Sequence, residues 1–388
     1  MLRYITAGES HGKGLTLVLE GMPAGVPISL ELINFQLARR QKGYGRGGRM
    51  KIETDTAEVT AGIRHGVSLG SPISIWVQNT DFRSWQNEMS PETINNFISK
   101  KLVDCPRPGH ADLTGGLKYN QRDLRNILER ASARETTVRV ALGGITSQFL
   151  AHFGIKIGGC VTVLGGVKAA DQNLPLDELI AKAEADEMRC VDPSASALMK
   201  AKVDEAKKAG NTVGGIFEVR VEGLPPGLGS HVQWDRKIDA RLAQAILSIQ
   251  AIKGVEFGKG FDLGHCFGSE AHDEIDYDRS NNKFFHRTNR AGGVEGGMTN
   301  GEPLIVRAVM KPIATLYSPL HSINIDSKKD IEASVERSDT CAVPAACVIA
   351  ENVISFVLAQ AFIEKFGGDS LIEIERNYKG YLDQIRAY

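Results

Sequence analysis

The most apolar stretch of the sequence is Ala342–Phe366. Its apolar side chains, such as Val348 and Phe362, fall on nearly every face of a helix instead of along one stripe. A helix of this kind has no face suited to water, so it must be enclosed by the rest of the protein or by an oligomer. Ser338 or Asp339 is the predicted N-cap of this helix.

A second core helix is predicted between Ser132 and Gly154. Ser132 followed by Glu135 is the pattern of a capping box, in which each side chain accepts a hydrogen bond from a backbone N–H at the helix start. Gly154 is the predicted C-terminal stop. Apolar residues recur between them at three- and four-residue steps: Val138, Ala141, Leu142, Ile145, Phe149 and Phe153. This spacing predicts a helix with one buried face.

Three arginines, Arg130, Arg134 and Arg139, flank the start of this second helix. Free backbone N–H groups and the positive end of the helix dipole make such a terminus a favourable place for an anion. The alternative is that the arginines pair with Glu129 and Glu135 on a solvated face. For an isolated helix, the solvated pairs are the preferred interpretation.

Two parts of the chain share a strand–turn–helix pattern. In the first, a strand over 15–20 precedes a helix that Ser29 caps and that ends near Gly43. In the second, a strand over 216–221 precedes a helix that begins at Asp235. An internal duplication is one interpretation, and the recurrence of a common Gly-Pro turn is the other.

The order of the predicted elements indicates the fold class. Strands interleaved with long helices, without the regular alternation of a doubly wound fold, predict an α+β fold of sheets packed on helices. Residues 168–210 are polar and only weakly periodic, which predicts peripheral helices there. No stretch has the composition of a linker, so we predict one domain over residues 1–388.

Composition limits the class of protein. The chain has 46 Lys and Arg against 47 Asp and Glu, which argues against a surface built throughout for nucleic acid or an anionic membrane. Its six cysteines lack CxxC spacing, so neither a zinc site nor a disulfide framework is predicted. No signal-peptide pattern and no charge-free window of membrane-spanning length are present, so a soluble cytoplasmic protein is expected.

The first candidate site is the glycine-flanked segment Thr6–Gly12. It is not a P-loop, because Gly8 and Lys13 are too close together and no Ser or Thr follows the lysine. Ser10 and His11 are adjacent, and no Asp partner is assigned that would make them a nucleophile and its base. His11 is therefore either a proton donor in a glycine-lined pocket or a solvent-facing residue of a tight turn.

The second candidate is Arg39–Lys51, with six cations, four glycines and no acid. Gly43, Gly45 and Gly48 match a dinucleotide-binding fingerprint, but a helix precedes them where that fold needs a strand. Glycines let guanidinium groups and backbone converge on phosphate or carboxylate, which favours a site for a polyanionic small molecule. An RGG-like nucleic-acid segment and a solvated charge run are the alternatives.

Three further stretches carry polar groups on loops. Cys105–Asp112 holds His110 between prolines and glycine, with Asp112 available to orient it as a base, and a structural loop histidine is the alternative. Residues 287–301 form a glycine-rich loop that is either mobile or in close contact with a ligand. Residues 311–315 start with a lysine and end with a threonine that are candidates for holding a phosphate.

Taken together and in order, these motifs resemble those of chorismate synthases over nearly the whole chain. They are Gly-Glu-Ser-His-Gly, Arg-Gln-Lys-Gly-Tyr-Gly-Arg-Gly-Gly-Arg, Arg-Pro-Gly-His-Ala-Asp, Glu-Arg-Ala-Ser-Ala-Arg-Glu-Thr, Gly-Gly-Met-Thr-Asn-Gly and an Arg-Ser-Asp that precedes Pro-Ala. Two positions depart from the family pattern, because Ala314 and Thr340 stand where proline is common. Neither change removes a side chain with an assigned chemical role.

The resemblance implies a β-α-β sandwich, with long central helices packed between antiparallel sheets, and a homotetramer. It implies conversion of 5-enolpyruvylshikimate 3-phosphate to chorismate and phosphate by a 1,4-elimination with no net redox change. Reduced FMN is the implied cofactor, with NADPH or an outside flavin reductase as the source of its electrons.

The resemblance also assigns roles to residues. His11 and His110 are implied proton donors, near the departing phosphate and near the flavin, and Asp339 helps to take up the proton that the substrate loses. The implied substrate-binding residues are Ser10, Arg46, Arg49, Arg107, Ser132, Arg134 and Arg337. The implied cofactor positions are Ala131, Ser132, Ala133, Gln250, Ala251, Gly296, Lys311, Pro312, Ile313, Ala314, Thr315 and Arg337 for flavin, and Arg40 and Arg46 for NADPH.

With these roles, Arg134 becomes an expected anion ligand, whereas the surface-pair interpretation stands for Arg130 and Arg139. Two other classes of protein remain as alternatives. A nucleic-acid binder built on Arg39–Lys51 would retain RNA in a steeply salt-dependent way. A purely structural oligomer would bind no flavin.

Overall fold

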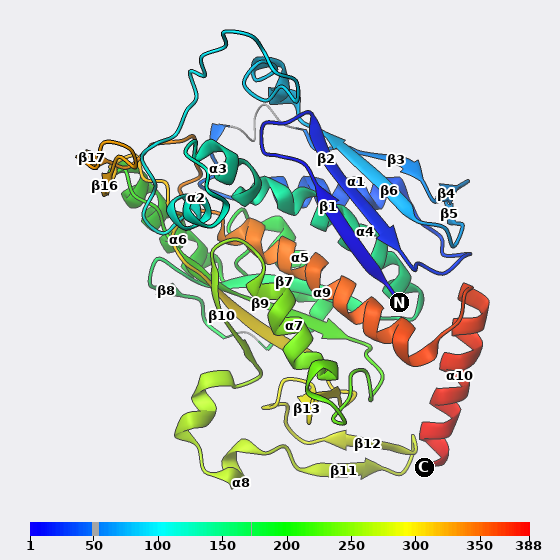
Figure 1. The fold of residues 1–388 in the computed structure, drawn as a ribbon. Helices are drawn as coiled ribbons and strands as arrows, with labels where there is room; N and C mark the ends of the chain where they lie inside the picture. The colour runs from blue at the N-terminus through cyan, green and yellow to red at the C-terminus, as the bar shows by residue number, and fades with distance from the viewer. Residues whose placement is uncertain (49–53, 172) are drawn as a thin grey trace.

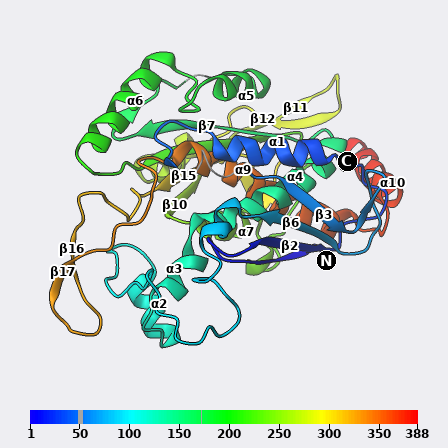
Figure 2. The same ribbon diagram turned by 90° about the horizontal axis from the view of Figure 1, so that it is seen from above.

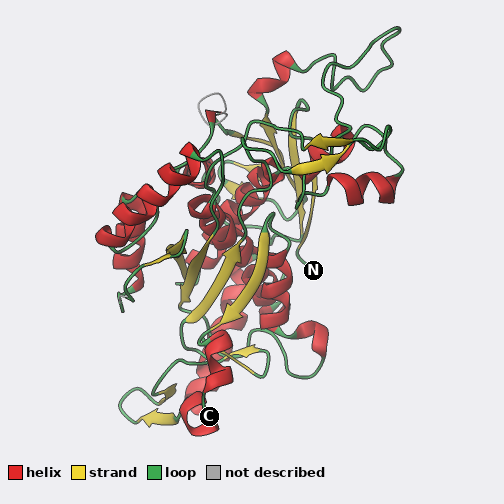
Figure 3. Ribbon diagram, turned by 90° about the vertical axis from the view of Figure 1, so that its left-hand side faces the viewer, coloured by secondary structure: helices red, strands yellow, loops and turns green. Residues whose placement is uncertain are grey.

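The structure, a computed structural model, describes residues 1–48, 54–171 and 173–388. Its two larger sheets have the strand orders β1-β2-β6-β3 and β10-β15-β9-β7-β8 (Figure 1). All neighbouring strands within them are antiparallel. Helices fill the middle of the molecule, with the strands of the two sheets on either side (Figure 3). The fold is therefore the predicted α+β class, arranged as a β-α-β sandwich.

The strands of the first sheet are β1 Arg3–Ala7, β2 Gly14–Glu20, β3 Ala57–Ala61 and β6 Ile73–Gln78. Those of the second are β7 Lys156–Leu164, β8 Val167–Lys168, β9 Gly215–Glu222, β10 Ile252–Phe257 and β15 Leu304–Met310. Four short hairpins pair β4 Ile63–Arg64 with β5 Val67–Ser68, β11 Ile275–Asp278 with β12 Lys283–His286, β13 Val294–Glu295 with β14 Met298–Thr299, and β16 His321–Ile323 with β17 Asp330–Glu332.

The long helices of the inner layer are α1 Leu30–Gln41, α4 Thr136–His152, α7 Ile238–Leu247 and α9 Val343–Phe366. The predicted peripheral helices are α5 Leu176–Ala185 and α6 Pro193–Lys208, which lie on the far side of the second sheet (Figure 2). The remaining helices are α2 Asp112–Tyr119, α3 Arg125–Ala131, α8 Gly268–Ala271 and α10 Leu371–Ala387.

The two halves of the sandwich repeat one topology. The chain order β1, β2, α1, β3, β6, α4 in the first half corresponds to β7, β9, α7, β10, β15, α9 in the second. When the strands are matched in this way, their order across the two sheets is also the same. The topology therefore supports the internal duplication that the short strand–turn–helix pattern indicated.

Helices α4 and α9 run parallel through the centre and lie very close together. Gly143 faces Asn352, and a Cβ on this glycine would lie 2.2 Å from the Asn352 Cβ. One turn further on, the hydroxyls of Thr146 and Ser355 are hydrogen-bonded, and Ser355 Oγ donates to the Gly143 carbonyl at 3.2 Å. Because the contacts advance in the same direction along both helices, the two N-termini lie at the same end of the molecule.

Helix α9 is as enclosed as its composition predicted. Within the described residues it is the one helix long and apolar enough to cross a membrane, and 94% of that apolar window is buried inside the protein. Side chains from both sheets and from the helices between them form one continuous hydrophobic core. This shared core is our reason for proposing that residues 1–388 form one domain.

Three predicted helix starts differ from the structure. The N-cap of α9 is Ala342, not Ser338 or Asp339, because Pro344 lies in the first turn and proline favours that position. Ser132 does cap, accepting from the Arg134 N–H at 3.2 Å, but it precedes a 3₁₀ turn and α4 begins at Thr136. Likewise α7 begins at Ile238, three residues after the predicted start.

The predicted capping box is also incomplete. The Glu135 carboxylate accepts from Thr6 Oγ1 at 3.1 Å and from Arg139 Nε at 3.2 Å, so it is engaged by other elements. By contrast, the Ser29 cap of α1 is confirmed, since its hydroxyl accepts from the Leu32 N–H. The stop at Gly154, which has a φ of +78°, is confirmed as well. The predicted stripe of α4 is buried, but burial is not limited to one face, since Val140, Gly144 and Leu150 are also buried.

Candidate active site

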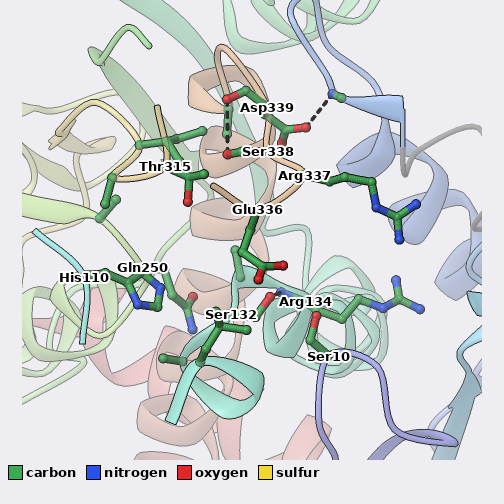
Figure 4. Close-up of a pocket in the computed structure, with 18 of the residues that line it drawn as sticks. Ser10, His110, Ser132, Arg134, Gln250, Thr315, Glu336, Arg337, Ser338 and Asp339 are labelled. Atoms are coloured by element: carbon green, nitrogen blue, oxygen red, sulfur yellow. Dashed lines mark hydrogen bonds between the residues drawn. The ribbon is translucent and has the colours of Figure 1, made fainter. Parts of the chain in front are cut away.

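The N-terminal ends of α4 and α9 open into a cavity of about 860 Å³. Loops from both halves of the chain complete its walls (Figure 4). His110 and Gln250 lie on one side of this cavity, Arg134 and Arg337 lie on the other, and Glu336 lies between them. Two parallel helices thus direct their free N–H groups and positive dipole ends toward one cavity, which favours an anionic ligand.

The charges that line the cavity strengthen this preference. Among the residues that the structure describes, three acidic ones line it: Asp81, Glu336 and Asp339. Within the same described ranges, eight lysines and arginines line it: Arg40, Arg46, Lys101, Arg107, Arg125, Arg134, Lys311 and Arg337. A cavity with this excess of cations is suited to a ligand that carries several negative charges.

His11 is one of two histidines in the cavity that are held by a carboxylate. It is only 7% exposed, in the loop between β1 and β2. Its backbone N–H donates to Glu129 Oε2, and its Nδ1 lies against Glu129 Oε1, both at 2.8 Å. The Trp85 ring stacks on the imidazole, with 3.9 Å between centroids. The alternative of a solvent-facing turn histidine is therefore wrong.

His110 is the second such histidine. Its Nδ1 lies 2.5 Å from Asp112 Oδ1, which confirms the predicted pairing of these two side chains. Asp112 is fully buried and also accepts from Arg107 Nε at 2.8 Å. Burial alone would raise the pKa of Asp112, but hydrogen bonds from His110 and Arg107 lower it well below its usual range. Arg107 also donates to Thr315 Oγ1 at 2.8 Å, which joins this loop to the 311–315 segment.

Beneath the cavity, Asp55 binds two of the expected arginines. Arg134 Nη1 donates to Asp55 Oδ1 at 2.5 Å, and Arg40 Nη1 donates to Asp55 Oδ2 at 3.3 Å. Arg40 also donates to Thr136 Oγ1 and to the Ala133 carbonyl, both at 3.0 Å. Burial lowers the pKa of Arg40 to about 9, and Asp55 opposes this shift. Arg40 remains charged near neutral pH, so it adds positive potential at the base of α4.

Asp339 connects the glycine-rich loop after α1 to the segment before α9. It pairs with Arg46 Nη1 at 3.0 Å and accepts from the Gly47 N–H at 2.6 Å. The next residue, Thr340, donates its N–H to the Gly45 carbonyl at 2.9 Å, a bond that proline at this position could not make. Arg337 reaches across to Asp81 Oδ2 at 2.7 Å, and 55% of its side chain is exposed.

Most residues expected to contact flavin also line the cavity: Ala131, Ser132, Ala133, Gln250, Ala251, Lys311, Ile313, Ala314 and Thr315. Ser10 lines it as well. Pro312 does not line it, although both of its neighbours do. Arg49 lies outside the described residues. Within the described part of the chain, no group of three His, Cys, Asp or Glu is placed to hold a metal ion.

Gly296 lies away from this cavity, between β13 and β14. The glycines of its segment serve close crossings of the backbone, because a Cβ on Gly292 would lie 2.3 Å from the Gly258 nitrogen. A Cβ on Gly297 would lie 2.5 Å from the Lys237 side chain. The glycine-rich pattern thus has a structural cause in this chain that needs no ligand.

The predicted pairing with a glutamate is confirmed for Arg139 but not for Arg130, and the predicted solvated face is wrong for the Arg139 pair because Glu135 is only 8% exposed. Arg139 pairs with Glu135 at 3.2 Å. Arg130 instead donates to the carbonyls of Thr6 and Gly8, both at 3.0 Å, and so holds the base of the loop that carries His11. The expectation that Glu129 lies on a solvated face is wrong, because it is only 3% exposed.

The interpretation of Arg39–Lys51 as a solvated charge run is also wrong for its first residues. Arg39 is 7% exposed and pairs with Glu184 at 2.6 Å and Glu351 at 2.7 Å. With Arg40 buried and Arg46 paired to Asp339, these arginines do not form an exposed stripe of the kind that binds nucleic acid.

Several residues of the site were not identified from the sequence: Asp55, Trp85, Lys101, Arg125, Glu129 and Glu336. Arg125 and Glu129 are four residues apart on one helix, and that spacing was the available signal. Arg125 also donates to Glu336 Oε1 at 2.7 Å. These two residues are 211 positions apart, so no local sequence pattern could have indicated the contact.

Comparison with known proteins gives a consistent result. The family model described as chorismate synthase matches residues 2–363. The chorismate synthases of Geobacter metallireducens and Brevibacillus brevis are each 56% identical to this chain; the matches cover all of it, and 100% and 99% of those proteins. A solved structure described as "Crystal Structure of Chorismate Synthase" is 43% identical, with a TM-score of 0.81, and the match covers 100% of this chain and 99% of that one. A chain that matches this family over its whole length, and that has a polyanion cavity with two histidine–carboxylate pairs, belongs to the chorismate synthase family of carbon-oxygen lyases.

Proposed function

We propose that this chain converts 5-enolpyruvylshikimate 3-phosphate to chorismate and phosphate by a 1,4-elimination that requires reduced FMN. The observation that carries the proposal is the cavity at the paired N-termini of α4 and α9, where cations and two histidine–carboxylate pairs meet. Family membership supplies the reaction class, and the cavity supplies a chemical reason for the particular substrate.

The charge of the proposed ligands matches that of the cavity. The substrate carries a phosphate and two carboxylates, roughly four negative charges near neutral pH, and the flavin phosphate adds up to about two more. Planar guanidinium groups bind phosphate and carboxylate oxygens in pairs, so Arg46, Arg107, Arg134 and Arg337 are proposed as the substrate's main counter-charges. Ser10 and Ser132 are proposed to add hydroxyl hydrogen bonds from the same wall.

The cavity is also suited to a flavin. Its volume of about 860 Å³ lies near the upper end of the roughly 300–1,000 Å³ that is typical of small-molecule sites, so it has room for more than one ligand. Gln250 Oε1 is a buried acceptor that has no hydrogen-bond partner among the described residues, and a ring N–H would satisfy it.

When bound, reduced FMN supplies an electron-rich ring beside the substrate and is not consumed. The protein's own part is to hold the substrate and to move protons. His11 is proposed to donate a proton to the departing phosphate. Asp339, held by Arg46 and Gly47, is proposed to take up the proton lost from the ring carbon. His110, held by Asp112, is proposed to keep a proton near the flavin.

An anaerobic assay tests this function. Purified protein, photoreduced FMN and substrate are mixed without oxygen, and released phosphate is measured beside an established chorismate synthase as positive control. Stoichiometric phosphate and chorismate are expected. Absence of phosphate release from this protein, with normal release from the control, would overturn the proposal.

The source of electrons and the assembly are further parts of the proposal. Arg40 and Arg46 are proposed to favour NADPH if the enzyme reduces its own flavin; otherwise an outside reductase does so. Anaerobic NADPH with oxidised FMN and no other reductase distinguishes the two, because only self-reduction bleaches the flavin absorbance.

A homotetramer and a cytoplasmic location are proposed as well, and light scattering on the eluted protein tests the former.

A further inference from the structure

Glu129 is not among the described residues that line the cavity, but its side chain contacts two residues that do, His11 and Arg125. The last turn of α3 forms several hydrogen bonds with the loop that carries His11. The Ser10 N–H donates to the Glu129 carbonyl at 3.0 Å, and Arg130 holds the carbonyls of Thr6 and Gly8. The Glu129 side chain then accepts from the backbone N–H of His11 with one oxygen and faces His11 Nδ1 with the other, both at 2.8 Å. Backbone and ring of one residue are therefore held by a single carboxylate.

This geometry determines which ring nitrogen carries the hydrogen. A carboxylate is an acceptor only, so Nδ1 must present a hydrogen to Glu129 Oε1. The other nitrogen, Nε2, is then the atom of His11 that is left to exchange a proton with a ligand in the cavity. In agreement, burial would raise the pKa of Glu129, but hydrogen bonds and charge from His11, with Arg125 adding, lower it overall, which keeps the acceptor ionised.

The surroundings hold this pair in place. Trp85 stacks on the imidazole at 3.9 Å, with 21° between the rings. Two cations lie over the Trp85 ring: Lys101 Nζ at 5.1 Å and the Arg125 guanidinium at 5.2 Å from its centroid. Arg125 also faces Glu129 at 3.5 Å. Glu129 is therefore the charged group in direct contact with His11. Arg125 and Lys101 lie one layer further out, over the Trp85 ring. Arg125 is itself paired with Glu336 at 2.7 Å.

We propose that Glu129 is the positioning residue of His11: it fixes the hydrogen on Nδ1, orients the ring, and reserves Nε2 for proton transfer to the departing phosphate. The assignment of the phosphate rests on the proposed function, whereas the tautomer does not. In the transfer, the proton on Nε2 passes to the leaving phosphate oxygen as its bond to carbon breaks, and His11 is left neutral with its hydrogen on Nδ1.

Glu129→Gln tests this role. The backbone N–H of His11 can only donate, so the amide oxygen must face it and the amide NH₂ must face Nδ1. Nδ1 then has to accept, which moves the hydrogen to Nε2 and disfavours the doubly protonated ring. We expect turnover to fall on the order of 100-fold with KM nearly unchanged. Because the variant lacks the negative charge that favours the doubly protonated ring, the alkaline limb of the pH profile of turnover should move to lower pH.

A readout independent of activity is the ring nitrogen signals of ¹⁵N-histidine-labelled protein, in which His11 is identified by their loss in His11→Gln. Wild type should show the hydrogen on Nδ1, and Glu129→Gln should show it on Nε2. Glu129→Asp should restore the wild-type tautomer with part of the activity. Glu135→Gln, which alters a buried glutamate that contacts no histidine in the described residues, should leave the tautomer unchanged.

The outcomes separate the two proposals. If wild type shows no phosphate release but the tautomer switches in Glu129→Gln, the function is wrong and the positioning role stands. If the tautomer is the same in wild type and Glu129→Gln, or if turnover stays within about twofold, the positioning role is wrong. If Glu129→Gln does not fold, Glu129→Asp decides: the role is wrong if the neutral His11 ring of this variant carries its hydrogen on Nε2 and not on Nδ1.

Discussion

The two histidine–carboxylate pairs of the cavity are built in opposite ways. His110 and Asp112 are two residues apart on one loop, whereas His11 and Glu129 are 118 residues apart and come from different elements. The local pair shares its carboxylate with Arg107, so one buried Asp112 supports a proton donor and an anion ligand at once. In the remote pair, both carboxylate oxygens bind His11 at 2.8 Å, and the neighbouring cation, Arg125, lies further away at 3.5 Å and has a closer partner in Glu336. A change at Asp112 should therefore affect substrate binding and proton transfer together. A change at Glu129 should affect mainly proton transfer.

The largest expected effect comes from removing either imidazole. His11→Ala and His110→Ala should each lower turnover by about 10²–10⁴-fold, the usual contribution of general acid–base catalysis. The oligomer that elutes on gel filtration should be unchanged, because neither ring belongs to the hydrophobic core. Near-normal turnover in both variants would contradict the assigned roles.

The next largest effect distinguishes Asp112, which contacts both Arg107 and His110, from Glu129, both of whose oxygens contact His11. Asp112→Asn leaves the buried Arg107 without its counter-charge, so the free energy of unfolding should fall by about 3–5 kcal/mol and substrate KM should rise together with the loss of turnover. Glu129→Gln should change mainly turnover. Chemical denaturation and steady-state kinetics measure both, and Glu375→Gln in the half-exposed His152 pair serves as the control, with a change within about 0.5 kcal/mol. If Asp112→Asn changed turnover alone, the shared role would be wrong.

The pH dependence of stability should report both carboxylates. The pKa values of Asp112 and Glu129 are lower in the folded protein than in an unfolded chain, where each is about 4. Each carboxylate therefore stabilises the fold above pH ~4, and this contribution is lost as the pH falls through the folded pKa. In Asp112→Asn and in Glu129→Gln, the free energy of unfolding should therefore decrease less steeply than in wild type as the pH is lowered. A limb as steep as that of wild type in both variants would contradict the assigned ion pairs.

The smallest expected effect concerns the aromatic support of the remote pair. Trp85→Leu removes the ring that stacks on His11 and should lower turnover by about two- to tenfold, the size of one aromatic contact. Trp85→Phe keeps a ring and should lie between Trp85→Leu and wild type. If Trp85→Phe were slower than Trp85→Leu, stacking would not be what holds the imidazole.

Several local patterns were reliable because the interaction partners lie within a few residues of each other. The Ser29 cap, the burial of the α4 stripe, the stop at Gly154 and the pairing of His110 with Asp112 were all predicted from short-range spacing and are confirmed. Such features depend on backbone geometry and on neighbours along the chain, which the sequence states directly.

The errors occurred where a side chain has a stronger partner elsewhere. Glu135 has the spacing of a capping box, but Thr6 and Arg139 compete for its oxygens. Glu129 has the composition of a surface pair, but packing of the His11 loop against α3 buries it. Arg39 looked solvated until α9 supplied Glu351, 312 residues later.

The sequence by itself therefore determined the existence of the long inner helices, the enclosed character of Ala342–Phe366 and the motifs that resemble chorismate synthase. Only the tertiary structure decided that two parallel helix N-termini meet at one cavity, and which carboxylate supports which cation or imidazole. The physical reason is that charged side chains removed from water must find partners wherever the fold brings them, and that pairing follows distance in space, not distance along the chain.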